Sequence, residues 1–450
     1  MADKRITVYG AGLAGCEAAW QAAERGARVT LVEMKPHKHT PAHHADGFAE
    51  LVCSNSLRSD VTSNAVGLLK EEMRRMGSLI MEAAEATRVP AGSALAVDRE
   101  KFSEYITEKI KNHPNIEVVY AEADSVDSET VSVIATGPLT SEPMADYIAN
   151  ELGFGSLHFF DAAAPIVSAE SINTDVAFFA SRYDKGDADY INCPMDEEQY
   201  NAFWSALVTA EEAELKEFDR DEQKKNIKVF EGCMPVEVMA RRGKDTLLFG
   251  PLKPVGLIDK RVGKESHAVV QLRKENKEGT MYNLVGFQTH LTFPEQRRVF
   301  RMIPGLENAE FLRYGVMHRN TYLNSPGNLD ERYRLVRSEK IGEGNGIYFA
   351  GQMTGVEGYI ESAGSGMVAG INAAYEALGE EALCFPRSTM LGAMASYVAN
   401  GGVSAFAPMN ANFGIIEPLP ARVKGGKIAK NQALADRALS IIDEIKEQRK

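Results

Sequence analysis

The sequence predicts an α/β fold, in which a discontinuous Rossmann-like domain is interrupted by an inserted α+β domain. Near the N-terminus, an apolar run over residues 6–9 enters a glycine-rich turn over residues 10–15. An alanine-rich helical pattern follows to about residue 25, and a second apolar run, residues 29–32, ends on Glu33. Strand, glycine-rich turn, helix, strand and acid, in this order and spacing, form the dinucleotide-binding fingerprint.

The residues of this turn have separate physical tasks. Gly10 permits the tight turn, Gly12 lets backbone N–H groups approach a pyrophosphate, and Gly15 allows the helix to pack closely on the strand. The N-terminus of the helix adds a partial positive charge that faces the phosphates. Glu33 is placed to accept hydrogen bonds from a ribose. The predicted cofactor contacts in this region are Gly10, Ala11, Gly12, Leu13, Ala14, Gly15 and Glu33.

A second glycine-rich segment, residues 346–359, lies toward the other end of the chain. Its pattern predicts a short strand over residues 347–350, a turn, and a helix from about residue 360 to residue 378. Many FAD enzymes close their flavin domain with such a late strand, turn and helix, whereas a nicotinamide dehydrogenase has no comparable need. We therefore predict FAD rather than NAD as the resident cofactor. The contacts expected from this segment are Gly351, Gln352, Glu357, Gly358 and Tyr359.

Three glycines, Gly364, Gly366 and Gly370, lie on the predicted late helix. Glycine inside a helix costs about 1 kcal/mol relative to alanine, so each of them should have a structural reason. We expect very close backbone packing or contact with the cofactor.

A chain of 450 residues is too long for one ordinary core and suggests two or three domains. We expect residues 1–142 to form the first part of the FAD-binding domain and residues 143–334 to form the insertion domain with the substrate contacts. Residues 335–450 should form the second part, with a C-terminal helix. The expected internal elements are strands over residues 116–120, 131–136, 228–230, 268–272 and 281–288, and helices over residues 196–218 and 429–448.

Composition narrows the class of protein. No apolar run approaches the roughly 20 residues of a membrane span, and the first strand begins almost at once, so we expect no signal peptide and a cytoplasmic protein. The net charge of −13 argues against a global attraction to polyanions but allows a local basic face. Residues 224–264 hold ten Lys or Arg against four acids, and residues 297–319 hold five Arg against two Glu. Either segment could form a nucleic-acid footprint.

Two of the five cysteines lie in polar loops rather than in apolar patterns. Cys53 is followed by Ser, Asn and Ser, with Arg58 close behind, and Cys233 is followed by a Met-Pro turn and then by Arg241 and Arg242. Nearby backbone N–H groups and guanidinium groups favour a thiolate, so both cysteines are candidate reactive groups. We expect the remaining three to be small buried hydrophobic residues: Cys16, Cys193 and Cys384. The unpaired spacing indicates reduced thiols in a reducing compartment.

Four histidines crowd the loop after Glu33, but no cysteine or acid stands at a recognised zinc spacing beside them, so we predict no metal site. The sequence contains no nucleophile elbow, Walker loop or His-Glu-x-x-His motif, so hydrolase, NTPase and zincin functions have no support. The histidines are His37, His39, His43 and His44.

Seven blocks of the sequence resemble those of the bacterial folate- and FAD-dependent tRNA (uracil-5-)-methyltransferases. The resemblance runs from end to end of the chain, and the blocks around Cys53, Cys233 and residue 250 are far more specific than the glycine-rich fingerprint. The blocks are residues 7–17, 51–57, 88–92, 96–99, 230–235, 249–256 and 351–362.

This resemblance implies methylation of the T-loop uridine at tRNA position 54, with the carbon taken from methylenetetrahydrofolate and reducing equivalents from NAD(P)H. It also implies that Cys233 and Cys53 are the two functional thiols. Carbon 5 of uracil is a poor nucleophile until a group adds to carbon 6, and a thiolate is the side chain best suited to that addition. On this hypothesis Cys233 attacks carbon 6, and Cys53 lies beside the isoalloxazine, where it acts as a general base or holds the reactive flavin adduct. Arg241 and Arg242 are the candidate tRNA contacts.

Three alternatives stay open from the sequence. The flavoprotein that modifies wobble uridines with carboxymethylaminomethyl groups shares the turn at residues 10–15 and the segment at residues 350–352, but it carries a long extra helical C-terminal domain. A small-molecule NAD(P)H:flavin oxidoreductase would make Cys233 incidental. A non-catalytic FAD-bound RNA-binding protein would need neither thiol. Substitution of the two thiols separates these hypotheses.

Overall fold

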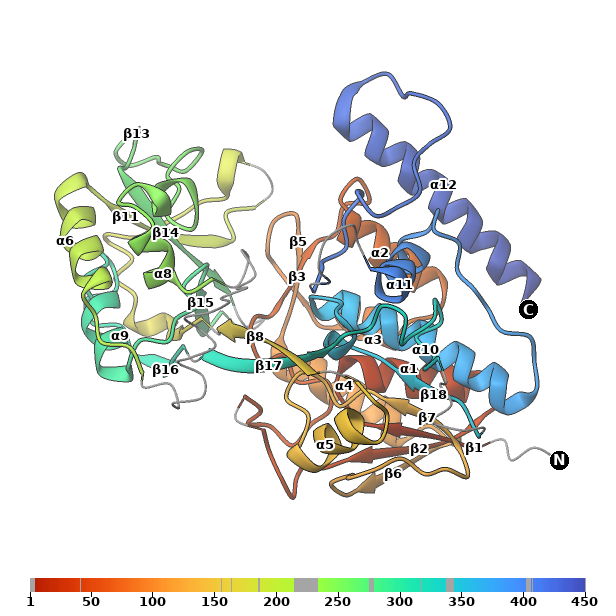
Figure 1. Ribbon diagram of the computed structural model, residues 1–450. Helices are drawn as coiled ribbons and strands as arrows, with labels where there is room; N and C mark the ends of the chain where they lie inside the picture. The colour runs from red at the N-terminus through yellow and green to blue at the C-terminus, as the bar shows by residue number, and fades with distance from the viewer. Residues whose placement is uncertain are drawn as a thin grey trace.

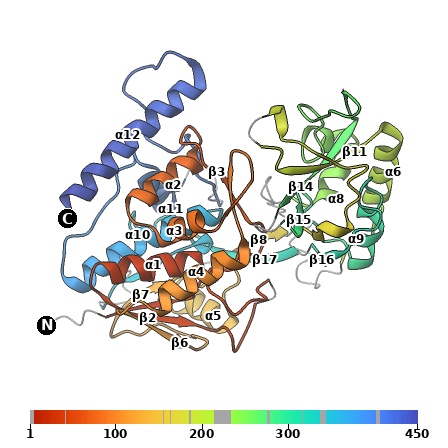
Figure 2. The same cartoon turned by 180° about the vertical axis from the view of Figure 1, so that it is seen from behind.

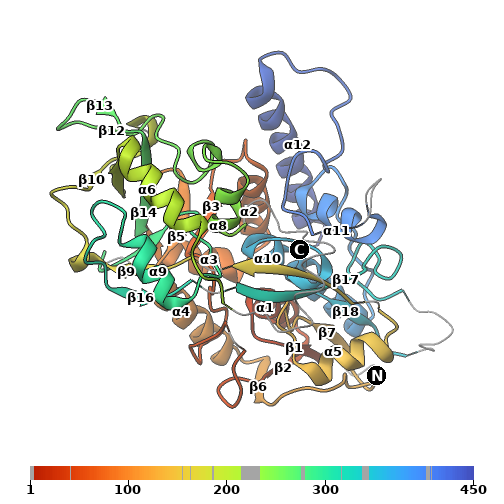
Figure 3. The same cartoon turned by 60° about the vertical axis from the view of Figure 1, so that its left-hand side comes forward.

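Two bodies joined by a two-stranded antiparallel ladder make up the molecule (Figure 1). The ladder pairs β8 (Ser156–Ala162) with β17 (Met317–Leu323), and Figure 3 shows it from another side. The larger body holds the first and the last described residues of the chain. The computed structural model describes residues 5–449 except 41, 155, 163, 185–186, 214–233, 275–278, 316, 337–343, 402–405 and 407.

The larger body is built on a five-stranded parallel sheet with the strand order β18-β7-β1-β2-β6. Val8 at its centre pairs with Leu31 on one side and Val133 on the other. All three side chains are fully buried, as expected of strands inside a covered parallel sheet. The strands are β1 (Arg5–Tyr9), β2 (Arg28–Glu33), β6 (Ile116–Tyr120), β7 (Val131–Ile134) and β18 (Ile347–Phe349).

Helices pack around this sheet, and Figure 2 shows α1 and α4 on the face seen from behind. A small antiparallel sheet of order β3-β5-β4 lies beside them. The helices are α1 (Leu13–Glu24), α2 (Ala65–Arg75), α3 (Leu79–Ala86), α4 (Arg99–Lys111), α5 (Glu142–Asn150), α10 (Tyr359–Leu378), α11 (Met390–Asn400) and α12 (Gly426–Gln448), with the 3-10 turn η5 (Gln352–Thr354). The small strands are β3 (Ser56–Ser59), β4 (Arg88–Val89) and β5 (Ala94–Val97).

The smaller body has a six-stranded antiparallel sheet with the order β10-β11-β14-β15-β9-β16 and its own buried apolar cluster. The strands are β9 (Ile166–Ser168), β10 (Phe178–Phe179), β11 (Tyr190–Met195), β14 (Ala268–Lys274), β15 (Met281–Leu284) and β16 (Phe311–Arg313), with the hairpin β12 (Ile258–Asp259) and β13 (Lys264–Glu265). The helices are α6 (Glu197–Val208), α8 (Val236–Arg241) and α9 (Phe293–Phe300), with the 3-10 turns η1 (Ala169–Ser171), η2 (Arg182–Asp184) and η4 (Thr246–Phe249).

The predicted α/β fold, with a discontinuous parallel domain and an inserted α+β unit, is confirmed by this topology. Three predicted elements were too long by two residues or more, and one of them is the strand expected over residues 131–136, which ends at Ile134. The helix expected over residues 196–218 begins after a capping box between Asp196 and Gln199 but ends at Val208, because the chain then turns to pair Glu212 with Leu291. The last part of that expected helix, residues 214–218, lies outside the described residues. The strand expected over residues 281–288 ends at Leu284, just before a turn at Gly286, whose φ is +78°. The strand expected over residues 228–230 lies outside the described residues.

The early and the late part of the chain meet in the larger body, where α10 crosses α1. A Cβ atom on Gly366 would lie 2.2 Å from the carbonyl oxygen of Ala14, and a Cβ on Gly370 would lie 2.4 Å from that of Ala18. Both distances are shorter than any real contact of a Cβ, so the helices pack backbone against backbone. The expected reason for glycine is thus confirmed at these two positions, and the contact holds the late segment beside the N-terminal turn.

Gly366→Ala should therefore destabilise the protein, whereas Gly364→Ala on the same helix should not. The added methyl at position 366 meets rigid backbone, and such overpacking costs typically about 1–3 kcal/mol. At position 364 the nearest atoms are side-chain carbons at 3.3 and 3.4 Å, which can shift, and the gain in helix propensity of about 1 kcal/mol offsets the strain. Urea denaturation measures both variants, and equal losses in the free energy of unfolding would contradict this explanation.

Candidate active site

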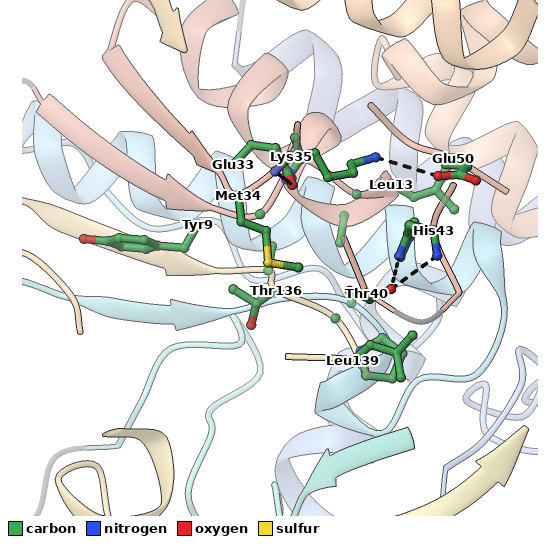
Figure 4. A pocket seen from close by; sticks show the side chains of 18 of the residues that line it. Tyr9, Leu13, Glu33, Met34, Lys35, Thr40, His43, Glu50, Thr136 and Leu139 are labelled. Atoms are coloured by element: carbon green, nitrogen blue, oxygen red, sulfur yellow. Dashed lines mark hydrogen bonds and ion pairs between the residues drawn. The ribbon is translucent and has the colours of Figure 1, made fainter. Parts of the chain in front are cut away.

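A deep pocket opens at the carboxyl ends of the parallel strands, where ligands bind in open α/β sheets (Figure 4). Five segments line this pocket: the N-terminal turn, the end of β2, the turn after β7, the late glycine-rich segment and the loop that carries Cys53. Among its lining residues are Gly10, Ala11, Gly12, Leu13, Ala14, Glu33, Cys53, Thr136, Gly351, Gln352 and Tyr359.

The glycines of the N-terminal turn differ in what surrounds them. Gly10 has a φ of +96°, and a Cβ there would lie 2.7 Å from the carbonyl oxygen of Ala135. A Cβ on Gly15 would lie 1.7 Å from the carbonyl oxygen of Gly10, so Gly15 serves packing and does not line the pocket. A Cβ on Gly12 would meet nothing within 4 Å. The space in front of Gly12, at the N-terminus of α1, is thus the open cradle that a pyrophosphate needs.

Glu33 is buried at the end of β2, with 6% of its surface exposed. The backbone N–H of Ala11 donates to its Oε2 at 2.6 Å, and that of Lys35 donates to its Oε1 at 2.9 Å. The carboxylate therefore ties the glycine-rich turn to β2. Because each carboxylate oxygen accepts about two hydrogen bonds, Glu33 can still accept from a ribose hydroxyl.

The late segment contributes Gly351, Gln352 and Tyr359 to the pocket wall, whereas Glu357 and Gly358 lie behind it. Gly351 has a φ of +88°, and its N–H donates to Ser365 Oγ at 2.8 Å. Glu357 accepts from Gln352 Nε2 at 2.8 Å and so orients that amide.

Gly358 precedes the first residue of α10 with a φ of +116°. A Cβ on it would lie 2.2 Å from the Oε2 of Glu361, whose other oxygen accepts from Arg58. Gly358 thus serves the entry of α10 rather than the pocket surface.

Tyr359 links this segment to the loop that carries Cys53. The Tyr359 hydroxyl accepts from the backbone N–H of Cys53 at 2.6 Å and from that of Ser54 at 3.2 Å. Burial raises the pKa of Tyr359, so the hydroxyl stays protonated and neutral. The Cys53 loop is thereby held against the pocket, and Cys53 itself is half-buried in the pocket wall.

Arginines from both bodies hold the same loop. Arg99 Nη1 donates to the carbonyl oxygen of Leu51 at 2.6 Å, from α4 of the larger body. From the smaller body, Arg313 on β16 donates to the carbonyl oxygen of Val52.

Arg273 on β14 of the smaller body completes this set. Its Nη2 donates to Ser54 Oγ at 2.5 Å, and its Nε donates to Asn55 Oδ1 at 3.1 Å. Sequence analysis missed Arg273 and Arg313, because they lie more than 200 residues from Cys53 and no local motif marks them.

Cys233 lies outside the described residues, and the described chain resumes at Met234. The two arginines that follow it close α8 (Val236–Arg241). Arg241 is ion-paired with Glu212, whereas Arg242 is exposed at the C-terminal end of the helix. The pair with Glu212 leaves Arg241 less available to a phosphate than its sequence position suggested.

His290 ties together the residues on both sides of the segment 214–233. Its Nδ1 lies 2.8 Å from Glu237 Oε1, and its Nε2 contacts Glu212. On the backbone, the N–H of Ala213 donates to the carbonyl oxygen of His290 at 2.8 Å, and the N–H of Val236 donates to that of Gln288 at 2.8 Å. The two flanks of the Cys233 segment are thus fastened to one short stretch of chain.

The contact of His290 with Glu212 and Glu237 is a contact between charged groups. Burial alone lowers the pKa of His290, but the carboxylates of Glu212 and Glu237 outweigh it and raise the pKa to about 9. The hydrogen bond from His290 lowers the pKa of Glu212 to about 2. His290 therefore carries a positive charge at neutral pH.

Of the three cysteines that were expected to be buried, two are buried and one is exposed. Cys16 and Cys193 are fully buried, and burial raises the pKa of both thiols. Cys384 is exposed, so the prediction that it is buried was wrong: the connection from α10 to α11 turns Leu383 and Phe385 inward and the residue between them outward. His43 lines the pocket, and no cluster suited to a metal ion occurs within the described residues.

The contribution of His290 to stability should depend on pH. Its folded pKa of about 9 exceeds the ordinary value of 6.5, so the stabilisation is complete below about pH 6.5 and is lost as the pH rises through about 9. The lowered pKa of Glu212 keeps that carboxylate charged until the pH falls well below 4.5, toward about 2. The difference in free energy of unfolding between wild type and His290→Gln should be largest between about pH 4.5 and 6.5 and shrink toward pH 9. Denaturant titrations across this range would contradict the prediction if the difference were constant.

Residues 5–381 match the protein family described as "Glucose inhibited division protein A". In solved structures, the chain is similar to Aquifex aeolicus GidA, with a TM-score of 0.69 and 18% identity over 98% of this chain and 73% of that one. This likeness supports the fold. None of the helices within the described residues is both long and apolar enough to span a bilayer.

Similarity to curated proteins is much higher. The chain is 60% identical over 439 residues to the methylenetetrahydrofolate--tRNA-(uracil-5-)-methyltransferase TrmFO of Acetivibrio thermocellus, a match that covers 98% of each chain. It is 58% identical over 438 residues to the protein of the same name from Heliobacterium modesticaldum, with 97% of each chain covered. The chain belongs to the family of methylenetetrahydrofolate–tRNA-(uracil-5-)-methyltransferases.

Proposed function

We propose that this chain forms 5-methyluridine at T-loop position 54 of tRNA, with methylenetetrahydrofolate as carbon donor, FAD as resident cofactor and NAD(P)H as the source of reducing equivalents. The single observation that carries the proposal is 60% identity to a named enzyme of this activity over 98% of the chain. The pocket adds independent support, because the glycine-rich turn and the Cys53 thiol line the same pocket.

The residues around the pocket fit FAD. The open space at Gly12 and the N-terminus of α1 suit a pyrophosphate, and the Glu33 carboxylate suits a ribose. Gly351, Gln352 and Tyr359 close the other side of the pocket, next to the Cys53 loop, where an isoalloxazine would lie. When bound and reduced, FAD supplies the hydride that turns a transferred methylene group into a methyl group.

The two thiols react with the uracil ring or move its protons. The Cys233 thiolate adds to carbon 6 of the uracil, which makes carbon 5 nucleophilic toward the one-carbon unit. Carbon 5 must afterwards lose its proton and Cys233 must leave. We assign the removal of that proton to Cys53, which its loop contacts with Tyr359 and Arg313 hold at the pocket wall.

We assign residues 1–142 and 335–450 to the FAD-binding domain and residues 143–334 to the insertion domain that contacts tRNA. Arg241 and Arg242 are proposed as contacts to the tRNA backbone, with Arg242 the more available of the two because Arg241 is paired with Glu212. A cytoplasmic location follows from the substrate and from the reduced thiols.

Purified protein, a tRNA transcript without 5-methyluridine, methylenetetrahydrofolate and NADPH should together yield tRNA with one 5-methyluridine at position 54. Mass spectrometry of nuclease fragments identifies the modified nucleotide. Omission of folate should abolish the product, because the chain has no other proposed carbon donor. Product formed with S-adenosylmethionine as the sole carbon source would refute the proposal.

Cys233→Ala should bind FAD and tRNA but lose turnover, because no other proposed side chain adds to carbon 6. Cys53→Ala should also be inactive and should in addition change the flavin absorption spectrum, because its thiol lies in the pocket wall. Cys384→Ala is the matched control, since this cysteine is exposed and lies outside the pocket lining. A wild-type rate for Cys233→Ala would remove the nucleophile role, and an unchanged spectrum for Cys53→Ala would move that thiol away from the flavin.

A further inference from the structure

Three aromatic rings form a parallel stack on the smaller body. Tyr314 stacks on Phe293 with ring centroids 4.7 Å apart and an interplanar angle of 15°, and on Phe311 with 5.3 Å and 13°. Phe311 packs against the buried core of the smaller body, whereas Phe293 is 51% exposed. The stack therefore leads from the core to solvent. One exposed apolar residue needs no explanation, but an exposed ring set parallel to two others is a flat surface of the kind on which a further ring stacks.

The stack is held firmly in place. The side-chain amide of Gln296, fully buried, donates to the carbonyl oxygen of Gly315 at 2.8 Å and accepts from the Gly315 N–H at 2.8 Å. These two bonds fasten α9, which begins at Phe293, to the residue after Tyr314. All three views of the fold show α9 and β16 side by side (Figures 1, 2 and 3). A platform that is rigid before binding loses little conformational freedom when a ligand arrives.

A guanidinium group borders the stack. Arg297 donates to the Tyr314 hydroxyl at 2.6 Å, and its Cζ lies 5.8 Å from the centroid of that ring. Arg298 is paired with Glu295, but Arg297 has no carboxylate partner among the described residues. Residues 297–319 carry five Arg against two Glu. A ring surface with an adjacent uncompensated positive charge is complementary to a base and its phosphate.

The stack also lies next to the Cys53 loop. Arg313, between Phe311 and Tyr314, donates to the carbonyl oxygen of Val52, the residue before Cys53. None of the three aromatic residues lines the flavin pocket, so the stack is a surface outside it. An exposed surface favours a base of a polymeric substrate over a folate pterin, because small ligands bind in concave pockets.

We propose that Phe293, Tyr314 and Phe311 form a stacking platform for one unpaired T-loop base of the tRNA, and that Arg297 contacts a phosphate beside it. This inference rests on the proposed function, because it takes tRNA as the substrate. An enzyme that acts on carbon 5 and carbon 6 of a base must separate that base from its stacked neighbours. The platform compensates for the stacking that is lost when the target uridine leaves the loop.

Phe293→Ala should weaken equilibrium binding of a tRNA transcript without 5-methyluridine between about fivefold and about 150-fold, the range for loss of one base stacked on an aromatic side chain. Phe293→Tyr should restore binding, because it keeps the ring. Phe179→Ala is the matched control: this residue is 54% exposed on the same body and should leave binding unchanged. The KM for methylenetetrahydrofolate, the FAD content and the midpoint of unfolding should stay at wild-type values in all three variants.

Arg297→Gln should make the slope of log affinity against log salt shallower by about one, as expected for loss of one phosphate contact. A set of transcripts, each with one abasic T-loop nucleotide, identifies the base. On one of these transcripts the penalty of Phe293→Ala should disappear, since the partner of the ring is already missing.

Three results would overturn the platform. Wild-type tRNA affinity of Phe293→Ala, with normal methylation by the wild-type enzyme, would remove the platform and leave the proposed function intact. A raised KM for folate with unchanged tRNA affinity would show that the ring holds a pterin instead. A wild-type protein that neither binds nor methylates tRNA would overturn both proposals.

Discussion

The close crossing of α1 and α10 is the contact on which the remaining architecture depends. Gly366 and Gly370 let the backbone of the late helix touch the carbonyl oxygens of Ala14 and Ala18. Because α1 begins in the cofactor turn and α10 begins at Tyr359, this crossing brings residues 10–14 and 351–359 to the same pocket. The pocket is thus made from two segments more than 300 residues apart, and it exists only when the chain closes on itself.

The Cys53 loop is the point at which both bodies meet the pocket. Tyr359 holds it from the larger body through two backbone N–H groups, and Arg273 and Arg313 reach it from the sheet of the smaller body. A movement of the smaller body would therefore also move the Cys53 loop. In the proposed function, this arrangement brings a tRNA on the smaller body next to the cofactor pocket of the larger body.

Charge is distributed locally rather than globally in this molecule. The chain carries a net charge of −13, which would repel a polyanion at long range. Binding of a nucleic acid, however, depends on the counterions released at individual phosphate contacts. Many arginines of the smaller body are already engaged: Arg241 with Glu212, Arg298 with Glu295 and Arg313 with the Cys53 loop. Arg242 is exposed and Arg297 has no carboxylate partner among the described residues, so these two arginines are the more available to a phosphate.

The sequence by itself determined the fold class and the cofactor turn. The alternation of apolar run, glycines and Glu33 is local, because each of these residues acts through its own backbone conformation or its nearest strand. It also indicated Cys53 as a candidate reactive thiol, from the polar loop around it and from the resemblance to the family to which the chain belongs. The sequence predicted the ends of elements less well where a tertiary contact ends the element. The chain after α6 is an example, because it turns to pair Glu212 with Leu291.

Only the tertiary structure decided which distant side chains meet. Arg273, Arg313 and Tyr359 converge on the Cys53 loop from strands and a helix whose sequences give no sign of it. Phe293 and Tyr314 stack because α9 and β16 lie side by side, although nothing in their spacing indicates a ring pair. Pairing between Arg241 and Glu212 likewise depends on the chain returning to Leu291. Local patterns predict local backbone, whereas these contacts depend on long-range closure of the chain.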